Sequence, residues 1–312
     1  MNIVFLDAKT IGEDIDLSGF DRFGTVVKYD FSTAKEARER TQDADILILN
    51  KVEINEYTIG EASHLKLVCV TATGTNNLDK EYLASRNIEW RNVAGYSTES
   101  VAQHTFAMLF YLYEKLRYYD DYVKNDLYVN DVCFTHFANV FHELSQKTWG
   151  IIGFGAIGQR VAEIAQAFGC KVVYYSTSGK NEQPGYTRLS LEELLAQSDI
   201  VSVHAPLDEN TKGLMNGKAF EQMKNSAVFL NLGRGPIVVE EDLARALEQG
   251  EIAAAGLDVL TVEPMREDHP LRKMKDSNRL FITPHIAWAS VEARHRLMKT
   301  IEGQIEEFLA TG

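Results

Sequence analysis

The residues of this chain with the clearest chemical meaning are three glycines with the spacing Gly-x-Gly-x-x-Gly, namely Gly153, Gly155 and Gly158. They follow an apolar run, Trp149 to Ile152, and precede apolar residues at helical spacing. In such a strand-turn-helix unit the glycines allow a tight turn, a close approach of phosphate and close helix packing. The N-terminus of the helix favours the negative charge of a pyrophosphate. The loop expected to bind a dinucleotide is Gly153, Phe154, Gly155, Ala156, Ile157 and Gly158.

Three later loops carry an arginine, a glutamate and a histidine: Arg234, Glu263 and His285. Each loop follows an apolar run typical of a buried β-strand. In a doubly wound sheet, ligands bind beyond the carboxyl ends of the strands, so these loops are expected at one edge of the sheet. A guanidinium binds a carboxylate, and an imidazole beside a carboxylate can move a proton. Taken singly, each residue also has a structural explanation, as a surface histidine, a Glu-Pro turn or an arginine bound to a backbone carbonyl.

Short apolar runs alternate with charged helical segments on both sides of the glycine loop, which predicts parallel sheets with helices on their faces. A long helix is expected from Glu99 to Tyr119, whereas Asn125 to Lys147 has no clear period and is expected to be irregular. The expected strands are 3–6, 25–29, 46–49, 67–70, 88–91, 149–152, 171–175, 200–204, 227–230, 254–258 and 280–283. The other expected helices are 33–41, 79–86, 191–197, 217–223, 240–249 and 291–309.

The composition is that of a globular protein with an acidic surface. Of the 312 residues, 45% are hydrophobic and 25% charged, and 32 Lys and Arg against 45 Asp and Glu give a net charge of -13. This balance disfavours nucleic acid as a partner. No apolar run has the length of a membrane span, and the N-terminus lacks the features of a secretion signal. Cys69, Cys133 and Cys170 stand singly among apolar residues, which predicts buried thiols, no disulfide or metal site, and a cytoplasmic location.

Six motifs occur together in one order along nearly the whole chain. The motifs are Ala72-Thr-Gly-Thr75, Gly153-Phe-Gly-Ala-Ile-Gly158, His204-Ala-Pro-Leu207, Asn231-Leu-Gly-Arg-Gly235, Asp258-Val-Leu-Thr-Val-Glu-Pro264 and Pro284-His-Ile-Ala-Trp-Ala289. On these motifs the chain resembles the D-isomer-specific 2-hydroxyacid dehydrogenase family, and most closely its hydroxypyruvate reductase or glycerate dehydrogenase branch.

The resemblance implies a catalytic trio of Arg234, Glu263 and His285. His285 would donate a proton when a 2-keto acid is reduced, Glu263 would hold its ring and favour the imidazolium, and Arg234 would hold the substrate carboxylate. The resemblance also implies that backbone N–H groups of Thr73 and Gly74 bind the substrate carboxylate. It implies that Arg234, His285 and Trp288 surround the substrate. Near the nicotinamide it places His204, Pro206, Leu232, Gly233 and Asp258, with Asp258 as the partner of the carboxamide and no chemical role for His204.

The fold class that the resemblance implies is α/β, with two doubly wound parallel-sheet domains. A Rossmann-type NAD(P)-binding domain, residues 99–286, would be inserted in a flavodoxin-like substrate-binding domain made of 1–98 and 287–312. A homodimer formed through the nucleotide domain and its long helix is also implied.

The identity of the cofactor is open between NAD(H) and NADP(H). The strand Lys171 to Tyr175 ends without the Asp or Glu that usually binds the ribose 2′-hydroxyl. Ser176, Thr177, Ser178 and Lys180 follow instead, and could accept a 2′-phosphate. The alternative is that these hydroxyls bind the 2′-hydroxyl or form a turn, which leaves NAD(H) in use.

The expected reaction is a reversible hydride transfer between NAD(P)H and a small 2-keto acid that gives an (R)-2-hydroxy acid, with hydroxypyruvate or glyoxylate as the best substrates. One alternative is a reductase of bulkier 2-keto acids, to whose pocket the segment 125–147 would contribute. A second alternative is a nucleotide-sensing interaction protein with little turnover, because a fold alone does not establish a function.

Overall fold

The computed structural model describes residues 1–180 and 182–311 and divides into two compact units. Unit 1 consists of Met1–Ser97 and Ala289–Gly312, and unit 2 of Thr98–Trp288. The chain therefore passes between the units twice, after Ser97 and after Trp288, where the sequence predicted crossings after residues 98 and 286. The last residue of the expected segment 287–312 lies outside the described residues.

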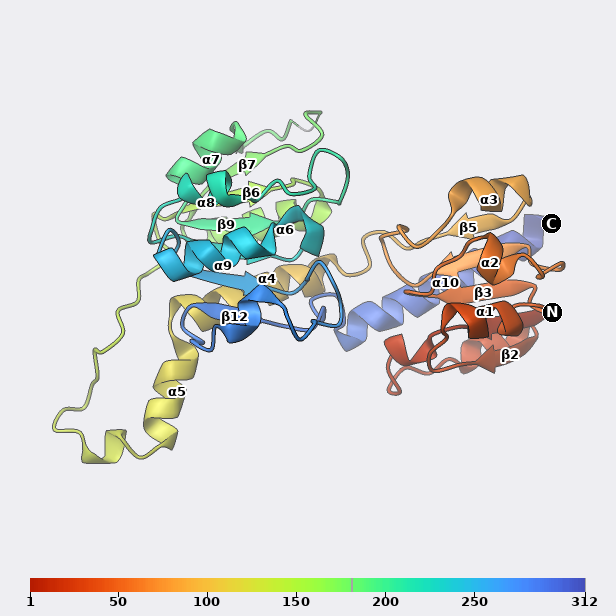
Figure 1. Ribbon diagram of the computed structural model, residues 1–312, viewed down its shortest axis with the longest axis horizontal. Helices are drawn as coiled ribbons and strands as arrows, with labels where there is room; N and C mark the ends of the chain where they lie inside the picture. The colour runs from red at the N-terminus through yellow and green to blue at the C-terminus, as the bar shows by residue number, and fades with distance from the viewer. Residues whose placement is uncertain (181, 312) are drawn as a thin grey trace. The chain divides into compact units, whose positions relative to one another are not determined.

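Unit 1 is built on a parallel five-stranded sheet in the order β2-β1-β3-β4-β5 (Figure 1). This is the flavodoxin-like order, in which the chain reverses direction beside the first strand. The strands are β1 (Asn2–Phe5), β2 (Thr25–Lys28), β3 (Ile46–Leu49), β4 (Leu67–Val70) and β5 (Glu89–Arg91). The helices are α1 (Ala34–Arg40), α2 (Glu56–Ile59), α3 (Lys80–Ser85) and the C-terminal α10 (Val291–Thr311).

Helix α10 belongs to unit 1 although unit 2 separates it from the other elements in sequence. It buries Leu297, Met298, Ile301 and Ile305 at helical spacing. On its outer side Arg294 donates to Asp14 through Nη2 over 2.8 Å. The N-terminal sheet and the last helix are thus parts of one core.

Unit 2 contains a parallel seven-stranded sheet in the order β12-β11-β10-β9-β6-β7-β8. Numbered from β6, this is the Rossmann order 3-2-1-4-5-6 with one further strand, β12, added beside β11, and its direction changes at β6. The strands are β6 (Thr148–Ile152), β7 (Lys171–Tyr175), β8 (Thr187–Arg188), β9 (Ile200–Val203), β10 (Val228–Asn231), β11 (Ala254–Leu257) and β12 (Leu280–Ile282).

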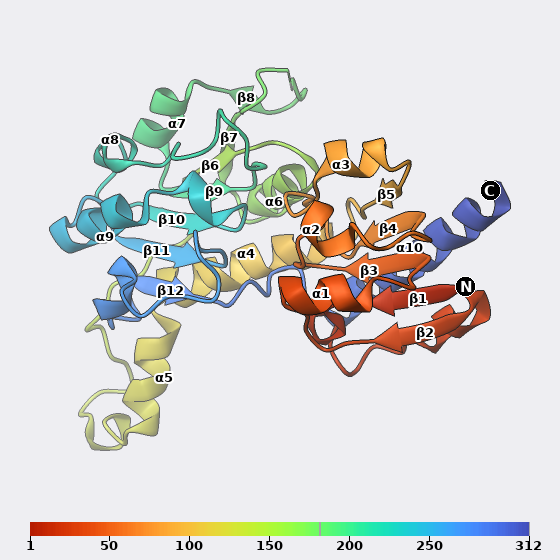
Figure 2. The same ribbon diagram turned by 45° about the vertical axis from the view of Figure 1, so that its right-hand side comes forward.

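Helices cover both faces of this sheet (Figure 2). On one face lie α4 (Thr98–Tyr113) and α6 (Ala156–Ala167), whose buried residues share a core with Trp149 and Ile151 of β6. On the other face lie α7 (Leu191–Gln197), α8 (Gly217–Glu221) and α9 (Glu240–Gln249), packed around Val201 and Phe229. The α/β class with two doubly wound sheets is the one predicted from the sequence.

The single helix expected from Glu99 to Tyr119 is wrong. Helix α4 ends at Tyr113, Lys115 takes a left-handed backbone conformation with φ of 57°, and α5 (Leu116–Lys124) starts in a new direction. Helix α4 follows the sheet and buries one face, but α5 has no buried residue and therefore no core to follow. No glycine or proline marks the break in the sequence.

The segment after α5 is irregular apart from a short 3₁₀ helix, Tyr128–Asn130. It returns to β6 along the outside of α5 (Figure 1). Cys133 lies on it and is exposed, so the expectation of three buried thiols is wrong for this residue, whereas Cys69 and Cys170 are buried. Among residues 1–180 and 182–311, no helix combines the length and apolar character needed to cross a bilayer.

Candidate active site

Five neighbouring strands of unit 2 end at the same edge of the sheet, and each is followed by a part of the predicted site. The glycine loop follows β6, His204 follows β9, Arg234 follows β10, Glu263 follows β11 and His285 follows β12. Adjacent strands lie about 4.8 Å apart. The fold therefore brings the dinucleotide loop and the three candidate catalytic residues of the predicted site to one edge of one sheet.

His285 and Glu263 form a direct pair. Nδ1 of the imidazole lies 2.7 Å from Oε2 of the carboxylate, and the two side chains are 24% and 30% exposed. The other oxygen, Oε1, accepts a hydrogen bond from the backbone N–H of Leu260 over 3.0 Å. Because an ionised carboxylate only accepts, Nδ1 carries the proton of this bond. Nε2 of His285 is then the nitrogen that can exchange a proton with a substrate.

The backbone of His285 is held in a left-handed conformation, with φ of 55°. Its N–H donates to the carbonyl oxygens of Asp258 and Thr283 over 2.8 and 2.9 Å. The carboxylate of Asp258, which is 2% exposed, accepts from the hydroxyl of Thr283 and from the N–H groups of Ile286 and Ala287. Asp258 thus fixes the turn that carries the imidazole.

Behind this turn, Nε2 of His104 on α4 lies 3.0 Å from the Thr283 hydroxyl. Since that hydroxyl donates to Asp258, His104 is the donor to its oxygen. Burial lowers the pKa of His104, which keeps the ring neutral, although the charge of Asp258 acts in the opposite direction. Through this bond His104 supports the turn.

The loop of Arg234 lies directly against the loop of Glu263. A Cβ added at Gly235 would lie 1.9 Å from the backbone carbon of Leu260, so only a glycine allows this contact. The side chain of Asn231 holds the Arg234 loop, because it donates to the carbonyl of Arg234 and accepts from the N–H of Gly233. Nη1 of Arg234 donates to the carbonyl of Gly233 over 2.8 Å.

The glycine loop has the shape that a pyrophosphate requires. Gly153 has φ of 89°, and a Cβ there would lie 2.6 Å from the backbone of Ala205. Gly155, the N-cap of α6, has open space where a Cβ would stand and makes no side-chain cap hydrogen bond. The N-terminus of a twelve-residue helix therefore faces an open cradle, which fits the phosphates of a dinucleotide.

His204 supplies a second sign that a ligand fits here. Trp149 donates to the Ser202 hydroxyl over 2.9 Å, and this hydroxyl lies 3.1 Å from Nε2 of His204. The hydroxyl donates to Nε2, so the proton of the neutral ring is on Nδ1. Nδ1 is buried and has no partner among the described residues. Burial lowers the pKa of His204 to about 3. A buried donor beside the glycine loop calls for an acceptor from a bound molecule.

The remaining cofactor residues predicted from the sequence lie where the strands place them. Pro206 follows His204 beyond β9, and Leu232 and Gly233 follow β10, where both are buried. Trp288, the predicted wall of the substrate pocket, is half-buried and packs against the core that contains α4.

Beside the turn after β7 lies a cation, Arg188, that was not predicted from the sequence. Ser176 is buried, Thr177 is half-buried, and Ser178 and Lys180 are exposed. Nη2 of Arg188 lies 3.8 Å from the position of a Cβ on Gly179, because the two-residue strand β8 pairs Arg188 with Tyr174 of β7. A strand of two residues has no periodic signal, so only the sheet pairing reveals this neighbour.

Thr73 and Gly74, which the sequence predicted to bind the substrate carboxylate, lie in unit 1, beyond the carboxyl end of β4. The Thr73 hydroxyl donates to the carbonyl of Val93 over 2.9 Å, and Asn92 donates to the carbonyl of Thr73. The loop thereby has a defined shape within its own unit.

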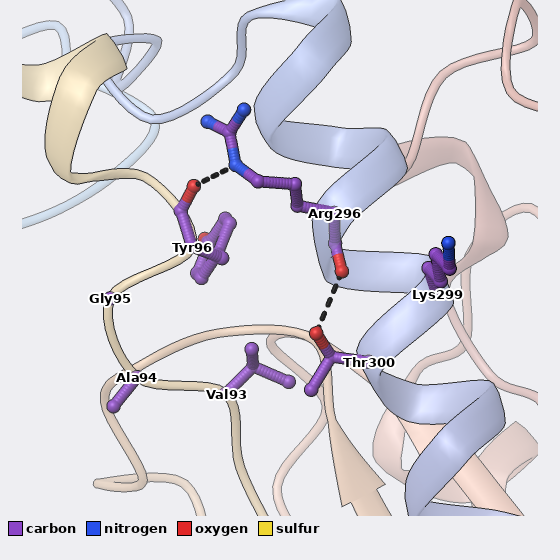
Figure 3. A pocket seen from close by; sticks show the side chains of 7 residues that line it. All are labelled: Val93, Ala94, Gly95, Tyr96, Arg296, Lys299 and Thr300. Atoms are coloured by element: carbon purple, nitrogen blue, oxygen red, sulfur yellow. Dashed lines mark hydrogen bonds between the residues drawn. The ribbon is translucent and has the colours of Figure 1, made fainter.

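Unit 1 also has a shallow pocket of about 440 Å³ between the segment after β5 and helix α10 (Figure 3). It is lined by residues 93–96 and by Arg296, Lys299 and Thr300 of α10. Arg296 is turned to the carbonyl of Tyr96, to which Nε donates over 3.0 Å. None of the site residues predicted from the sequence lines this pocket.

Comparison with known proteins finds one enzyme family and several of its relatives. The model of the family "D-isomer specific 2-hydroxyacid dehydrogenase, NAD binding domain" matches residues 106–287. A hydroxypyruvate reductase of Blautia hydrogenotrophica is 37% identical over 99% of this chain and 97% of its own length. A glycerate dehydrogenase of Methylorubrum extorquens is 33% identical over 99% of this chain and 96% of its own. An acyclic imino acid reductase in complex with NADPH and D-Arg has a TM-score of 0.88 at 31% identity, over 100% of this chain and 98% of that one.

Proposed function

Because the chain belongs to the D-isomer-specific 2-hydroxyacid dehydrogenases, as its motifs predicted, we propose that it reversibly reduces hydroxypyruvate or glyoxylate to the (R)-2-hydroxy acid or its achiral counterpart. The family matches by its NAD-binding domain, so a nicotinamide dinucleotide is the cofactor. The observation that carries the proposal is the pair of His285 and Glu263, 2.7 Å apart, at the same sheet edge as the glycine loop.

In the proposed mechanism, His285 and Arg234 act on the substrate and Glu263 acts on His285. Nε2 of His285 gives its proton to the carbonyl oxygen during reduction and takes it back during oxidation. The carboxylate of Glu263 orients the ring and stabilises the imidazolium. The guanidinium of Arg234 binds the substrate carboxylate and polarises the carbonyl. The bound nicotinamide supplies or accepts the hydride.

The same proposal assigns the remaining contacts. The loop Gly153 to Gly158 holds the pyrophosphate, and residues after β9 and β10 lie beside the nicotinamide. Thr73 and Gly74 offer backbone N–H groups to the substrate carboxylate, as they do in the family pattern that the motifs match. For Asp258 as the partner of the carboxamide, the family pattern is the sole support. The oxygens of its carboxylate already accept hydrogen bonds from the turn of His285.

We propose that NADPH is accepted as well as NADH. Residues 176–180, which follow β7, contain no Asp or Glu that would repel a 2′-phosphate. They contain three hydroxyls and Lys180, and Arg188 lies beside Gly179. Comparison of kcat/KM for the two cofactors tests this. Replacing Arg188 by Ala should weaken NADPH binding about tenfold and leave NADH binding unchanged, and a strong preference of the wild type for NADH would contradict the proposal.

A spectrophotometric screen of 2-keto acids with both reduced cofactors tests the function itself. We expect the highest kcat/KM with hydroxypyruvate or glyoxylate. His285→Ala should lower kcat by about 10³-fold, the scale of general acid catalysis, with the Kd for NADH within about twofold of wild type. His295→Ala, on the exposed side of α10, is the control and should leave kcat unchanged. Near-normal turnover by His285→Ala would remove the assignment.

The same screen distinguishes the alternatives. A preference for bulkier 2-keto acids would indicate a larger pocket, and nucleotide binding without turnover of any keto acid would indicate a sensing protein. The intact trio supports an enzyme.

We also propose a homodimer whose contact surface is the segment of unit 2 between α5 and β6, residues 125–147. Val132 is 104% and Phe134 88% exposed, and the same segment exposes several more large apolar side chains. Such a surface on an otherwise acidic chain is typical of an interface. A second copy of this chain is the proposed partner, and a cytoplasmic location is the proposed setting. The further exposed apolar residues are Leu127, Val129, Phe137, Val140 and Phe141.

A further inference from the structure

We propose that Glu240 is a positioning residue for Glu263, and that it acts by holding the backbone of Thr261. Glu240 is the first residue of α9 and is 9% exposed. Its Oε1 accepts a hydrogen bond from the N–H of Thr261 over 2.8 Å. Thr261 lies two residues before Glu263 on the loop after β11. The inference rests on the catalytic role proposed above for Glu263.

The other oxygen of Glu240 faces a buried histidine. Oε2 lies 3.1 Å from Nε2 of His269, which is 7% exposed. Nδ1 of this ring accepts from the N–H of Leu271, so the proton of the neutral ring is on Nε2 and faces the carboxylate. The ring N–H does not have the geometry of a hydrogen bond to this oxygen, so the contact is only a close approach of a polar N–H to the carboxylate. The directed bond of Glu240 is the one to Thr261.

A buried carboxylate is tolerated at this place because it stands in the first turn of a helix. The N-cap Val239 makes no side-chain hydrogen bond, and Glu240 meets the positive end of the α9 dipole. Helix α9 is itself anchored by Leu243 and Leu247, which are fully buried. Glu240 therefore connects a firmly packed helix to the loop that follows β11.

That loop is held on three sides around Leu260 and Thr261. Gly235 packs against Leu260 from the Arg234 side, and Glu263 turns back to accept from the Leu260 N–H. Glu240 supplies the third contact, at Thr261. Without it, the Thr261 N–H loses its acceptor, and the backbone that sets the distance from Glu263 to His285 loses its tether to α9. Small displacements of a catalytic pair are enough to cost large factors in rate.

A double-mutant cycle with Glu263→Gln tests the proposal. Glu240→Met keeps the length of the side chain and removes the acceptor, and we expect it to lower kcat about tenfold. In the Glu263→Gln background the same change should lower kcat by less than about twofold, because both act on one unit. Glu240→Gln keeps an acceptor for Thr261 and should stay within about threefold of wild type. The Kd for NADH, measured by fluorescence, should be unchanged in all of these variants.

Asp199 offers a control, since its carboxylate also accepts from a backbone N–H, that of Thr148, and has a second partner, Lys224. It stands at the opposite edge of the same sheet, before β9. Asp199→Leu should lower the melting temperature and leave kcat unchanged. If Glu240→Met does not fold, His269→Leu takes its place in the cycle, with a smaller expected loss.

The outcomes separate this inference from the proposed function. Equal losses from Glu240→Met in both backgrounds, a Glu240→Gln variant as poor as Glu240→Met, or the same loss of kcat in Asp199→Leu would each overturn the positioning role alone. An unchanged kcat in Glu263→Gln itself would overturn the catalytic role of Glu263, and the positioning role with it.

Discussion

His285 reaches Glu263 from a backbone conformation that few residues with a Cβ adopt. Such a conformation costs about 1–3 kcal/mol and persists where the surroundings determine it. Here the surroundings are the three donors that converge on the carboxylate of Asp258, from Thr283, Ile286 and Ala287. The buried carboxylate of Asp258 therefore holds the turn that carries the imidazole, and Glu263 holds the imidazole itself.

We expect Asp258→Asn to destabilise unit 2 and to lower kcat. An amide cannot accept on its nitrogen, so at least one of the converging donors stays unsatisfied, at a cost of about 1–3 kcal/mol. Urea denaturation measures the loss of unfolding free energy. A loss of NADH affinity with unchanged stability would instead favour the role of Asp258 as carboxamide partner.

His204 gives the stability a defined pH dependence. Burial lowers its pKa to about 3 in the folded protein, from an ordinary value of 6.5. The unfolded chain binds the proton first as the pH falls, so stability is complete above pH 6.5 and decreases toward pH 3. Between pH 6.5 and 5 we expect the wild type to lose on the order of 1–2 kcal/mol more than His204→Asn. Urea denaturation at both pH values measures this, and equal losses in the two proteins would contradict it.

At this scale the sequence nominated the residues that we propose to touch the reactants, and it did not nominate the residues that hold them in place. The types and order of Arg234, Glu263 and His285 were enough to nominate the trio, and the structure brings them to one edge. Glu240 and His269 carry no such signal, because a glutamate at the start of a helix is ordinarily a solvent-exposed residue. Their burial depends on the packing of α9 against the loop after β11, which no local pattern encodes.

Among the elements, the contact between the Arg234 loop and the Glu263 loop is the tightest that bears on the site. It requires Gly235, because a Cβ would lie 1.9 Å from the backbone of Leu260. Gly235→Ala should push the two loops apart, with a loss of about 2 kcal/mol in unfolding free energy and a lower kcat, since it displaces Arg234 and Glu263 together. Gly303→Ala, which meets open space on α10, is the control. Equal kcat in both variants would show that the contact does not matter for the site.

Most strands could be predicted closely because they are short apolar runs between turn residues. Strand β8 is the exception, since Thr187–Arg188 contains no apolar residue. The runs 46–49, 67–70 and 171–175 agree with β3, β4 and β7 at both ends. The break between α4 and α5 could not be predicted, since residues 99–119 keep helical spacing throughout. What ends α4 is the loss of a surface to bury against, which is a property of the sheet and not of the local sequence.

At the scale of the molecule, the net charge of -13 makes the local cations of the site decisive for an anionic substrate. The same acidity contrasts with the apolar segment that projects from unit 2 (Figure 1). From the sequence this segment was expected to be irregular, because its apolar residues follow no period, and its one suggested role was in the pocket of a reductase of bulkier 2-keto acids. Its exposure, and with it the argument for a second copy of the chain, comes from the structure.

The double variant Val132→Asp/Phe134→Asp should convert the proposed homodimer to a monomer, because charges in an apolar interface are costly to bury. Sedimentation velocity measures the change in mass. Phe31→Asp, which alters a 65% exposed phenylalanine in unit 1, is the control and should leave the mass unchanged. A wild type that sediments as a monomer at micromolar concentration would contradict the dimer.

Helix α10 completes a core whose other elements precede unit 2 in the chain. During synthesis a ribosome has therefore released every strand of the second sheet before the helix that buries Leu297 and Ile301 against the first one exists. Since domains fold as units while the polypeptide emerges, the middle of the chain can reach its native state while the beginning still waits for the end. Unit 1 begins the chain and yet is completed last, so its unfinished N-terminal sheet is the part of the nascent protein that most needs protection from aggregation.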